Sequence, residues 1–91
     1  MTVRVTIPSQ LQKFVGEQNT LAIAAHNIAN LLDLLDEQWP ELRSRLRHHD
    51  GKLHRFVNLY VNQEDIRFLS GLNTVLNSGD EVSIVPAVAG G

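Results

Sequence analysis

The sequence predicts a single small α+β domain in which one main helix covers one face of a β-sheet. Three observations support this prediction. The chain has 91 residues, which is enough for one domain and too few for two. Apolar residues alternate with polar ones, as in strands with one buried face, near both ends of the chain and at residues 54–62. Between these segments, residues 28–35 repeat apolar side chains at the spacing of a helix.

The first predicted strand covers residues 3–7, where three apolar side chains alternate with polar ones. Pro8 ends the pairing because proline lacks a backbone N–H. A short helical turn over residues 9–15 follows, and residues 19–24 are expected to form a second strand that pairs with the first. The N-terminal part of the chain therefore predicts two strands separated by a helical turn.

Asn27 is the predicted N-cap of the main helix, because its side chain can accept a hydrogen bond from the first helical turn. The apolar face of this helix consists of Ile28, Leu31, Leu32 and Leu35. Pro40 is expected to end the helix, and residues 41–47 to form a second, short and mostly solvated one.

Residues 54–62 give the clearest strand, with alternate side chains on opposite faces. One face carries Val57, Leu59 and Val61, and the other carries Phe56, Asn58 and Tyr60. A short extended piece at residues 66–68 follows, and then a helical turn in which Leu72, Val75 and Leu76 are expected to pack.

The last predicted strand covers residues 81–85 and buries two apolar side chains. If the first and last strands are neighbours, the main helix crosses one face of the sheet between them. This is the β-grasp arrangement, here with a mixed sheet of four or five strands and one main covering helix.

The composition excludes several kinds of function. Eight Lys and Arg against ten Asp and Glu give a formal net charge of −2, with no concentrated basic stripe to neutralise phosphates, so nucleic acid is not an expected partner. The chain has no cysteine and no pattern typical of a nucleophile elbow or a phosphate-binding glycine loop, so we do not expect it to be an enzyme. No apolar run approaches the roughly 20 residues that cross a bilayer, so we expect no membrane association and a cytoplasmic protein.

Two sets of side chains are weighed as binding residues. The spacing of the four histidines matches no helical i, i+4 pair, so we expect solvated loop histidines, and no metal site with Asp50, for His26, His48, His49 and His54. The aromatic pair Phe56 and Tyr60 has two interpretations of similar weight. One is a packing stripe across strands, and the other is a partner-docking face that includes Asn58.

The chain closes with small residues and two glycines, which favours a division into a β-grasp domain at residues 1–85 and an extended flexible tail at residues 86–91. A frayed terminus is the competing interpretation. Six extended residues reach about 20 Å, and glycine enters narrow channels because it lacks a Cβ. The terminal carboxylate, with a pKa of about 3.3–3.7, is ionised at neutral pH and can attack the α-phosphate of ATP.

The segments 51–62, 77–82 and 86–91 resemble the ubiquitin-like sulfur carriers, and the resemblance extends over essentially the whole chain. This family includes the thiamin sulfur carrier and the small subunit of molybdopterin synthase. The similarity is greatest to the bacterial branch that serves cysteine biosynthesis. The resemblance therefore implies a ubiquitin-like β-grasp fold and a carrier that serves as a co-substrate of partner enzymes.

The resemblance also implies the chemistry and the partners. An E1-like adenylating enzyme would consume ATP to activate Gly91, and sulfur would replace AMP to give a thiocarboxylate. A PLP-dependent cysteine synthase that uses O-phosphoserine would receive the sulfur, and a JAMM-type zinc peptidase would release cysteine. PLP and zinc would belong to these partners, with no cofactor on the chain itself. The tail in the partner channels would comprise Pro86, Ala87, Val88, Ala89 and Gly90.

Three alternatives stay open from the sequence. The chain could be a small subunit of molybdopterin synthase, which donates sulfur to the molybdenum cofactor precursor. It could be a ubiquitin-like protein modifier, although it offers only Lys13 and Lys52 for building chains on itself. It could also be a purely structural interaction module, in which case the terminal glycine would be dispensable.

Overall fold

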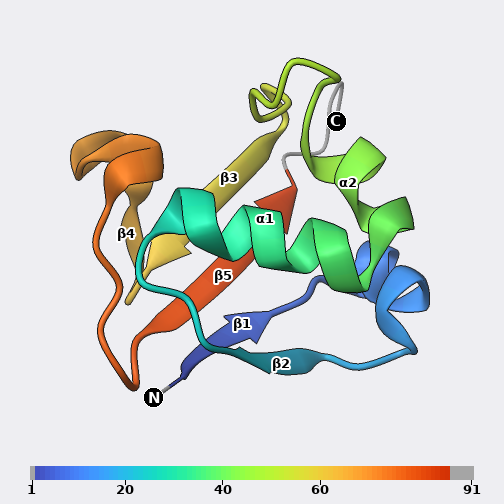
Figure 1. The fold of residues 1–91 in the computed structure, drawn as a ribbon, viewed down its shortest axis with the longest axis horizontal. Coiled ribbons are helices and arrows are strands. Elements are labelled where there is room, and N and C mark those ends of the chain that lie inside the picture. Colours follow the sequence, from blue (N-terminus) through green and yellow to red (C-terminus); the bar gives the residue numbers. More distant parts are fainter. Residues whose placement is uncertain (1, 87–91) are drawn as a thin grey trace.

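Alternating apolar residues build a five-stranded sheet in the computed structural model, which describes residues 2–86 (Figure 1). The strand order is β2-β1-β5-β3-β4. The strands are β1 (Val3–Thr6), β2 (Thr20–Ile23), β3 (Val57–Val61), β4 (Glu64–Asp65) and β5 (Glu81–Pro86). No helix within residues 2–86 is long and apolar enough to cross a membrane.

The first and last strands are neighbours at the centre of the sheet, as the sequence predicts. β1 and β5 run parallel, with Val5 opposite Val82, while β2 and β3 pair antiparallel on either side of them. The parallel pair requires a crossover connection, and this connection contains the main helix. The predicted mixed β-grasp sheet is therefore confirmed.

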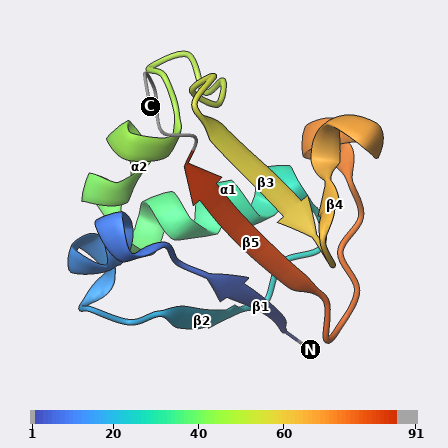
Figure 2. The same ribbon diagram turned by 180° about the vertical axis from the view of Figure 1, so that it is seen from behind.

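The main helix α1 (Ile28–Gln38) covers one face of the sheet, and Figure 2 shows that the opposite face carries no such helix. Its predicted cap is confirmed, because the Asn27 side chain accepts a hydrogen bond from the N–H of Asn30 at 2.7 Å. The predicted apolar face is fully buried, and it consists of Ile28, Leu31, Leu32 and Leu35.

The second helix α2 (Pro40–Leu46) begins at Pro40, the residue predicted to separate the two helices. As expected, most of this helix is exposed, but Leu42 and Leu46 are completely buried. α2 packs between α1 and the 3-10 helix η1 (Ser9–Val15), which gives both leucines apolar neighbours.

The chain beyond β2 departs from the prediction at three places. The strand predicted at residues 54–62 begins only at Val57, whose N–H donates to the carbonyl of His54 and so forms a turn. Residues 66–68 form the 3-10 helix η2 (Ile66–Phe68) instead of an extended piece, and the short edge strand is β4. In the predicted helical turn only Leu76 packs in the core, since Leu72 is exposed and Val75 has 67% of its surface exposed.

We expect Leu35→Ala to lower the free energy of unfolding by about 2–5 kcal/mol, because it opens a cavity between α1 and the sheet. Chemical denaturation with an unchanged m-value would measure this loss. Glu37→Ala, an exposed change on the same helix, is the control and should stay within about 0.5 kcal/mol of the parent. Equal losses in the two variants would contradict the placement of the core.

Candidate functional site at the end of the last strand

The candidate site lies where β5 ends. Pro86 is the last residue of β5 and lies opposite Val57, the first residue of β3. The chain therefore leaves the sheet beside the turn that contains Phe56 (Figure 2). Pro86 is the one residue of the predicted tail that the structure describes, and it is half-buried. The other predicted positions, Ala87, Val88, Ala89, Gly90 and Gly91, lie outside the described residues.

The predicted docking residues all lie close to this point, but not on one regular strand. Asn58 and Tyr60 are in β3, opposite Val85 and Ser83, on the sheet face that α1 does not cover. Both are half-buried. Phe56 belongs to the turn before β3 instead and has 49% of its surface exposed.

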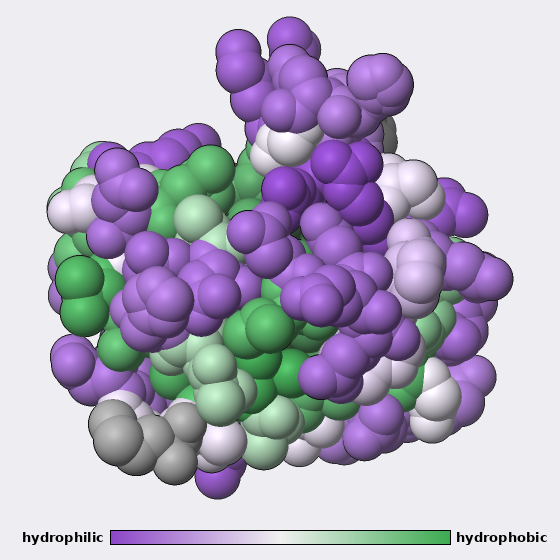
Figure 3. All heavy atoms as spheres, viewed as in Figure 1, coloured by the Kyte–Doolittle hydropathy of each residue, from purple (hydrophilic) through white to green (hydrophobic). Residues whose placement is uncertain are grey.

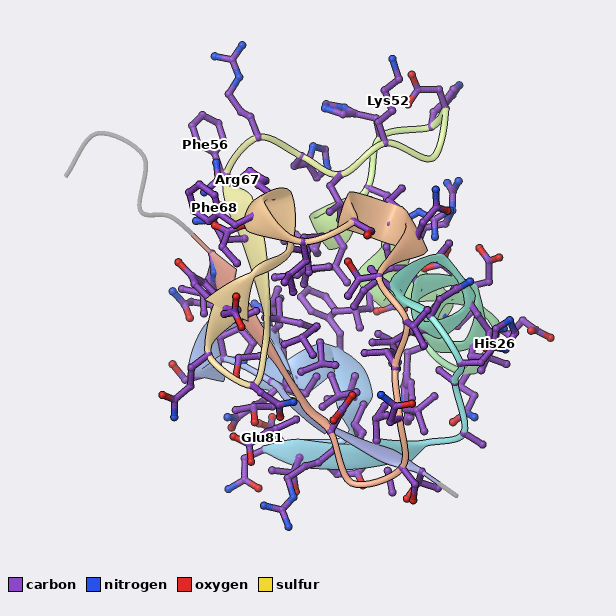
Figure 4. The ribbon with its side chains drawn as sticks, turned by 90° about the vertical axis from the view of Figure 1, so that its left-hand side faces the viewer. His26, Lys52, Phe56, Arg67, Phe68 and Glu81 are labelled. Atoms are coloured by element: carbon purple, nitrogen blue, oxygen red, sulfur yellow. The ribbon has the colours of Figure 1, made fainter. Side chains whose placement is uncertain are left out.

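Two apolar residues that the sequence analysis did not select enlarge this surface. Val85 is 42% exposed and lies opposite Asn58. Phe68 is 84% exposed and projects from η2, and Figure 4 shows it on the same side of the molecule as Phe56, away from α1. We define the docking face as Phe56, Asn58, Tyr60, Phe68 and Val85. Asp65 directly precedes η2 and is of a residue type that often caps helices. It is the sequence signal that could have predicted the helical turn from which Phe68 projects.

The Asp65–Arg67 pair stabilises η2 and therefore fixes the backbone position from which the Phe68 side chain projects. The Asp65 carboxylate accepts a hydrogen bond from the backbone N–H of Arg67 at 2.8 Å. It also forms an ion pair with Nη2 of the Arg67 side chain at 2.6 Å. The Arg67 side chain, followed by its backbone N–H, holds the pKa of Asp65 below its ordinary value of 3.8. In turn, the carboxylate raises the pKa of Arg67.

A shallow hollow of about 300 Å³ lies beside these residues. Its lining includes Asn58 of the docking face and the charged side chains of Arg55, Asp65 and Arg67. Exposed aromatic side chains next to arginines are the residue types that dominate binding at protein interfaces. The arrangement is therefore suited to holding a partner protein beside the end of β5.

The structure brings together two of the four histidines, His48 and His54. The rings of His48 and His54 pack edge to face with centroids 4.2 Å apart. Nε2 of His54 lies 2.9 Å from the carbonyl of Ser44, so this nitrogen is assigned as the donor. Within residues 2–86, no group of three or more His, Asp or Glu side chains is placed to hold a metal ion. His48 and His54 thus join the loop after α2 to that helix.

A mixed sheet with parallel first and last strands and a helix across one face defines the class of ubiquitin-like β-grasp proteins. Comparison with known proteins shows to which family within this class the chain belongs. Residues 5–91 match the model of the ThiS family. The chain is 42% identical over 93 residues to the sulfur carrier protein CysO of Mycobacterium tuberculosis (strain H37Rv), with 100% of both sequences covered.

Solved structures agree with the sequence match. A chain in the crystal structure of the Amycolatopsis orientalis BexX/CysO complex is 37% identical, with a TM-score of 0.88 over 98% of this chain and 99% of that one. The crystal structure of Mycobacterium tuberculosis CysO is 40% identical, with a TM-score of 0.85 over 94% of this chain and 99% of that one. The chain belongs to the ThiS family.

We expect Asp65→Asn to lower the melting temperature at neutral pH, because the ionised carboxylate is the partner of Arg67. A carboxyl group whose pKa is lowered by folding stabilises the fold above its ordinary pKa, and this stabilisation is lost as the pH falls through the folded pKa. The melting temperatures of the two proteins should therefore differ at about pH 7 and converge as the pH falls below the ordinary pKa range of carboxyl groups. Glu64→Gln, an exposed neighbour, is the control. A difference that is independent of pH would contradict this role of the charge.

Proposed function

We propose that this chain is a sulfur carrier protein that carries sulfur as a thiocarboxylate on Gly91 and is consumed as a co-substrate by partner enzymes. The observation on which this rests is the ThiS-family match, which runs from the first strand to Gly91. The full-length similarity to the sulfur carrier protein CysO supports it. In this proposal residues 1–85 form the β-grasp domain that partner enzymes bind, and residues 86–91 form the C-terminal segment that enters their active sites.

The proposed chemistry takes place at the terminal carboxylate. An oxygen of the Gly91 carboxylate attacks the α-phosphate of ATP, and pyrophosphate leaves to give an acyl-adenylate. Hydrosulfide then attacks the activated carbonyl through its sulfur, AMP departs, and loss of the S–H proton leaves a thiocarboxylate. The thiocarboxylate sulfur is nucleophilic and can be transferred to an electrophilic carbon of a second substrate. Since the chain has no cysteine, no thiol of the carrier itself competes for the activated carbonyl.

The recipient that we propose is a PLP-dependent cysteine synthase acting on O-phosphoserine, with a JAMM-type zinc peptidase that later releases cysteine. The similarity to CysO supports this recipient, because the aligned region covers the whole of both chains. The cofactors PLP and zinc would be bound by those enzymes. The role of this chain is to dock through its folded surface and to present Gly91 to each enzyme in turn.

We expect one residue appended after Gly91 to abolish sulfur loading while leaving the fold intact. The test incubates the protein with an ATP-dependent activating enzyme from its host, ATP and sulfide, and then measures its intact mass. Replacement of a terminal oxygen by sulfur adds about 16 Da. A variant extended by one residue at the N-terminus is the matched control and should load normally. Loading of the C-terminally extended variant would exclude Gly91 as the sulfur site.

We expect Phe56→Ala and Phe68→Ala to raise the KM for the carrier in the activation reaction by about tenfold each, because exposed aromatic anchors dominate docking. The melting temperatures should stay close to that of the parent, since Phe68 is 84% exposed and Phe56 is 49% exposed, and neither belongs to the buried core. Val75→Ala is the control, because Val75 is also an exposed apolar residue but lies outside the docking face. A large fall in melting temperature would instead assign these rings to the packing of the fold.

A further inference from the structure

The charge of the molecule is divided unevenly. Five of the eight Lys and Arg fall within residues 43–55, together with only one of the ten Asp and Glu. This segment therefore carries a net charge of +4, while the remainder of the chain carries −6. The net charge of −2 over the whole chain conceals this local concentration. Locally, the last turns of α2 and the following loop are strongly basic.

Two of these five cations are already neutralised inside the protein. Nη1 of Arg47 lies 3.3 Å from Asp33 and 3.4 Å from Asp36, and Nε of Arg43 lies 3.2 Å from Asp36. The Arg47 side chain is mostly buried in this contact between α1 and α2. Burial raises the pKa of Asp36, and the two arginines oppose that rise. Arg43 and Arg47 thus hold the two helices together and are not available to a partner.

The other three cations are presented to solvent. Arg45, Lys52 and Arg55 are exposed, and within residues 2–86 none of them takes part in an ion pair. Arg45 lies over the ring of Phe14, 5.1 Å from its centroid. The acidic residue of the segment, Asp50, accepts a hydrogen bond from the backbone N–H of Lys52. We call Arg45, Lys52 and Arg55 the basic shoulder.

The basic shoulder lies beside the end of β5. Arg55 is two residues before Val57, which pairs with Pro86, and it lines the hollow next to Asn58. Figure 1 shows the loop after α2 at the same end of the molecule as the tip of β5, and Figure 3 shows a lobe of hydrophilic side chains at that end. In Figure 4, Lys52 projects from the same loop that leads to Phe56.

We propose that the basic shoulder binds an acidic protein surface at the mouth of the channel that receives the chain end, and that it accelerates and orients docking. This inference rests on the proposed function, because the partner is the enzyme that takes residues 86–91. Charges at the rim of an interface act mainly on the association rate, and their effect falls with ionic strength. The apolar docking face would then supply the short-range contacts.

The observations favour an acidic protein over a nucleic acid. The shoulder offers only three available cations, whereas non-specific binding to a phosphate backbone draws on a larger number of phosphate contacts. The rest of the chain has a net charge of −6, which repels a polyanion that extends past the shoulder. A compact acidic patch on a protein avoids this repulsion, because it meets only the shoulder.

The test compares Lys52→Gln/Arg55→Gln with Asn73→Asp/Ser78→Asp, which lowers the net charge by the same two units at exposed positions away from the shoulder. The probe is the activating enzyme that loads the wild-type protein in the mass assay. The KM and kcat for the carrier are measured at about 50 mM and about 500 mM NaCl. Binding of an oligouridylate is measured in parallel by fluorescence anisotropy.

We expect the shoulder variant to raise KM about three- to tenfold at low salt with kcat nearly unchanged, and the difference to shrink at high salt. The control variant should follow the wild type. Equal KM values for the shoulder variant and the control would overturn the inference while the mass shift at Gly91 still supported the carrier function. Tighter binding of the oligouridylate than of the enzyme, lost in the shoulder variant, would also overturn it. Failure of the wild type to load is a separate result, and it would reject the proposed function instead.

Discussion

The parallel pairing of β1 with β5 is the constraint on which the rest of the molecule depends. It places the first and last strands at the centre of the sheet, although about 75 residues separate them. The intervening chain must therefore cross one face, and α1 does so with a fully buried row of leucines and isoleucine. The pairing of β5 with β1 ends at Ser83, and at Pro86 only β3 continues beside β5, with Val57 opposite Pro86. The pairing with β3 therefore sets where β5 ends, and this is the position from which the proposed function requires residues 86–91 to extend.

The sequence predicted the parts of this fold in which a local pattern and the tertiary environment agree. Alternation identified β1 and β5, and helical spacing with the Asn27 cap identified α1, because each of these elements buries one regular face. The errors lie where the tertiary environment outweighs the local pattern, as at residues 54–56, which continue the alternation of β3 but lie outside the strand. α2 is mostly exposed, as its charged residues predict, and Leu42 and Leu46 bury one side of it against α1 and η1.

The candidate site was predictable in part for the same reason. Alternation in β3 correctly placed Asn58 and Tyr60 on the uncovered face, because period two requires it. The sequence pattern predicts an extended segment at residues 66–68, whereas the 3-10 helix η2 that forms there is what makes Phe68 project. The Asp65 carboxylate, which turns the chain into η2, is a single-residue signal that alternation patterns do not register. Residues 87–91 lie outside the described structure, so Gly91 as the sulfur site stays a prediction from the sequence.

The two surfaces beside the end of β5 differ in physical character, and this difference matters under the proposed function, in which the carrier docks with more than one enzyme. Apolar contact at Phe56 and Phe68 acts only at short range and depends on the shape of the partner. The charges of the basic shoulder act over about 10 Å at 0.1 M salt and depend little on exact shape. A carrier that used only apolar contact would need a complementary surface on every partner before any attraction began. Under the proposed docking, the charges lie next to the end of β5, so partners with different folds would need to share only an acidic rim to be attracted to the same end of the carrier.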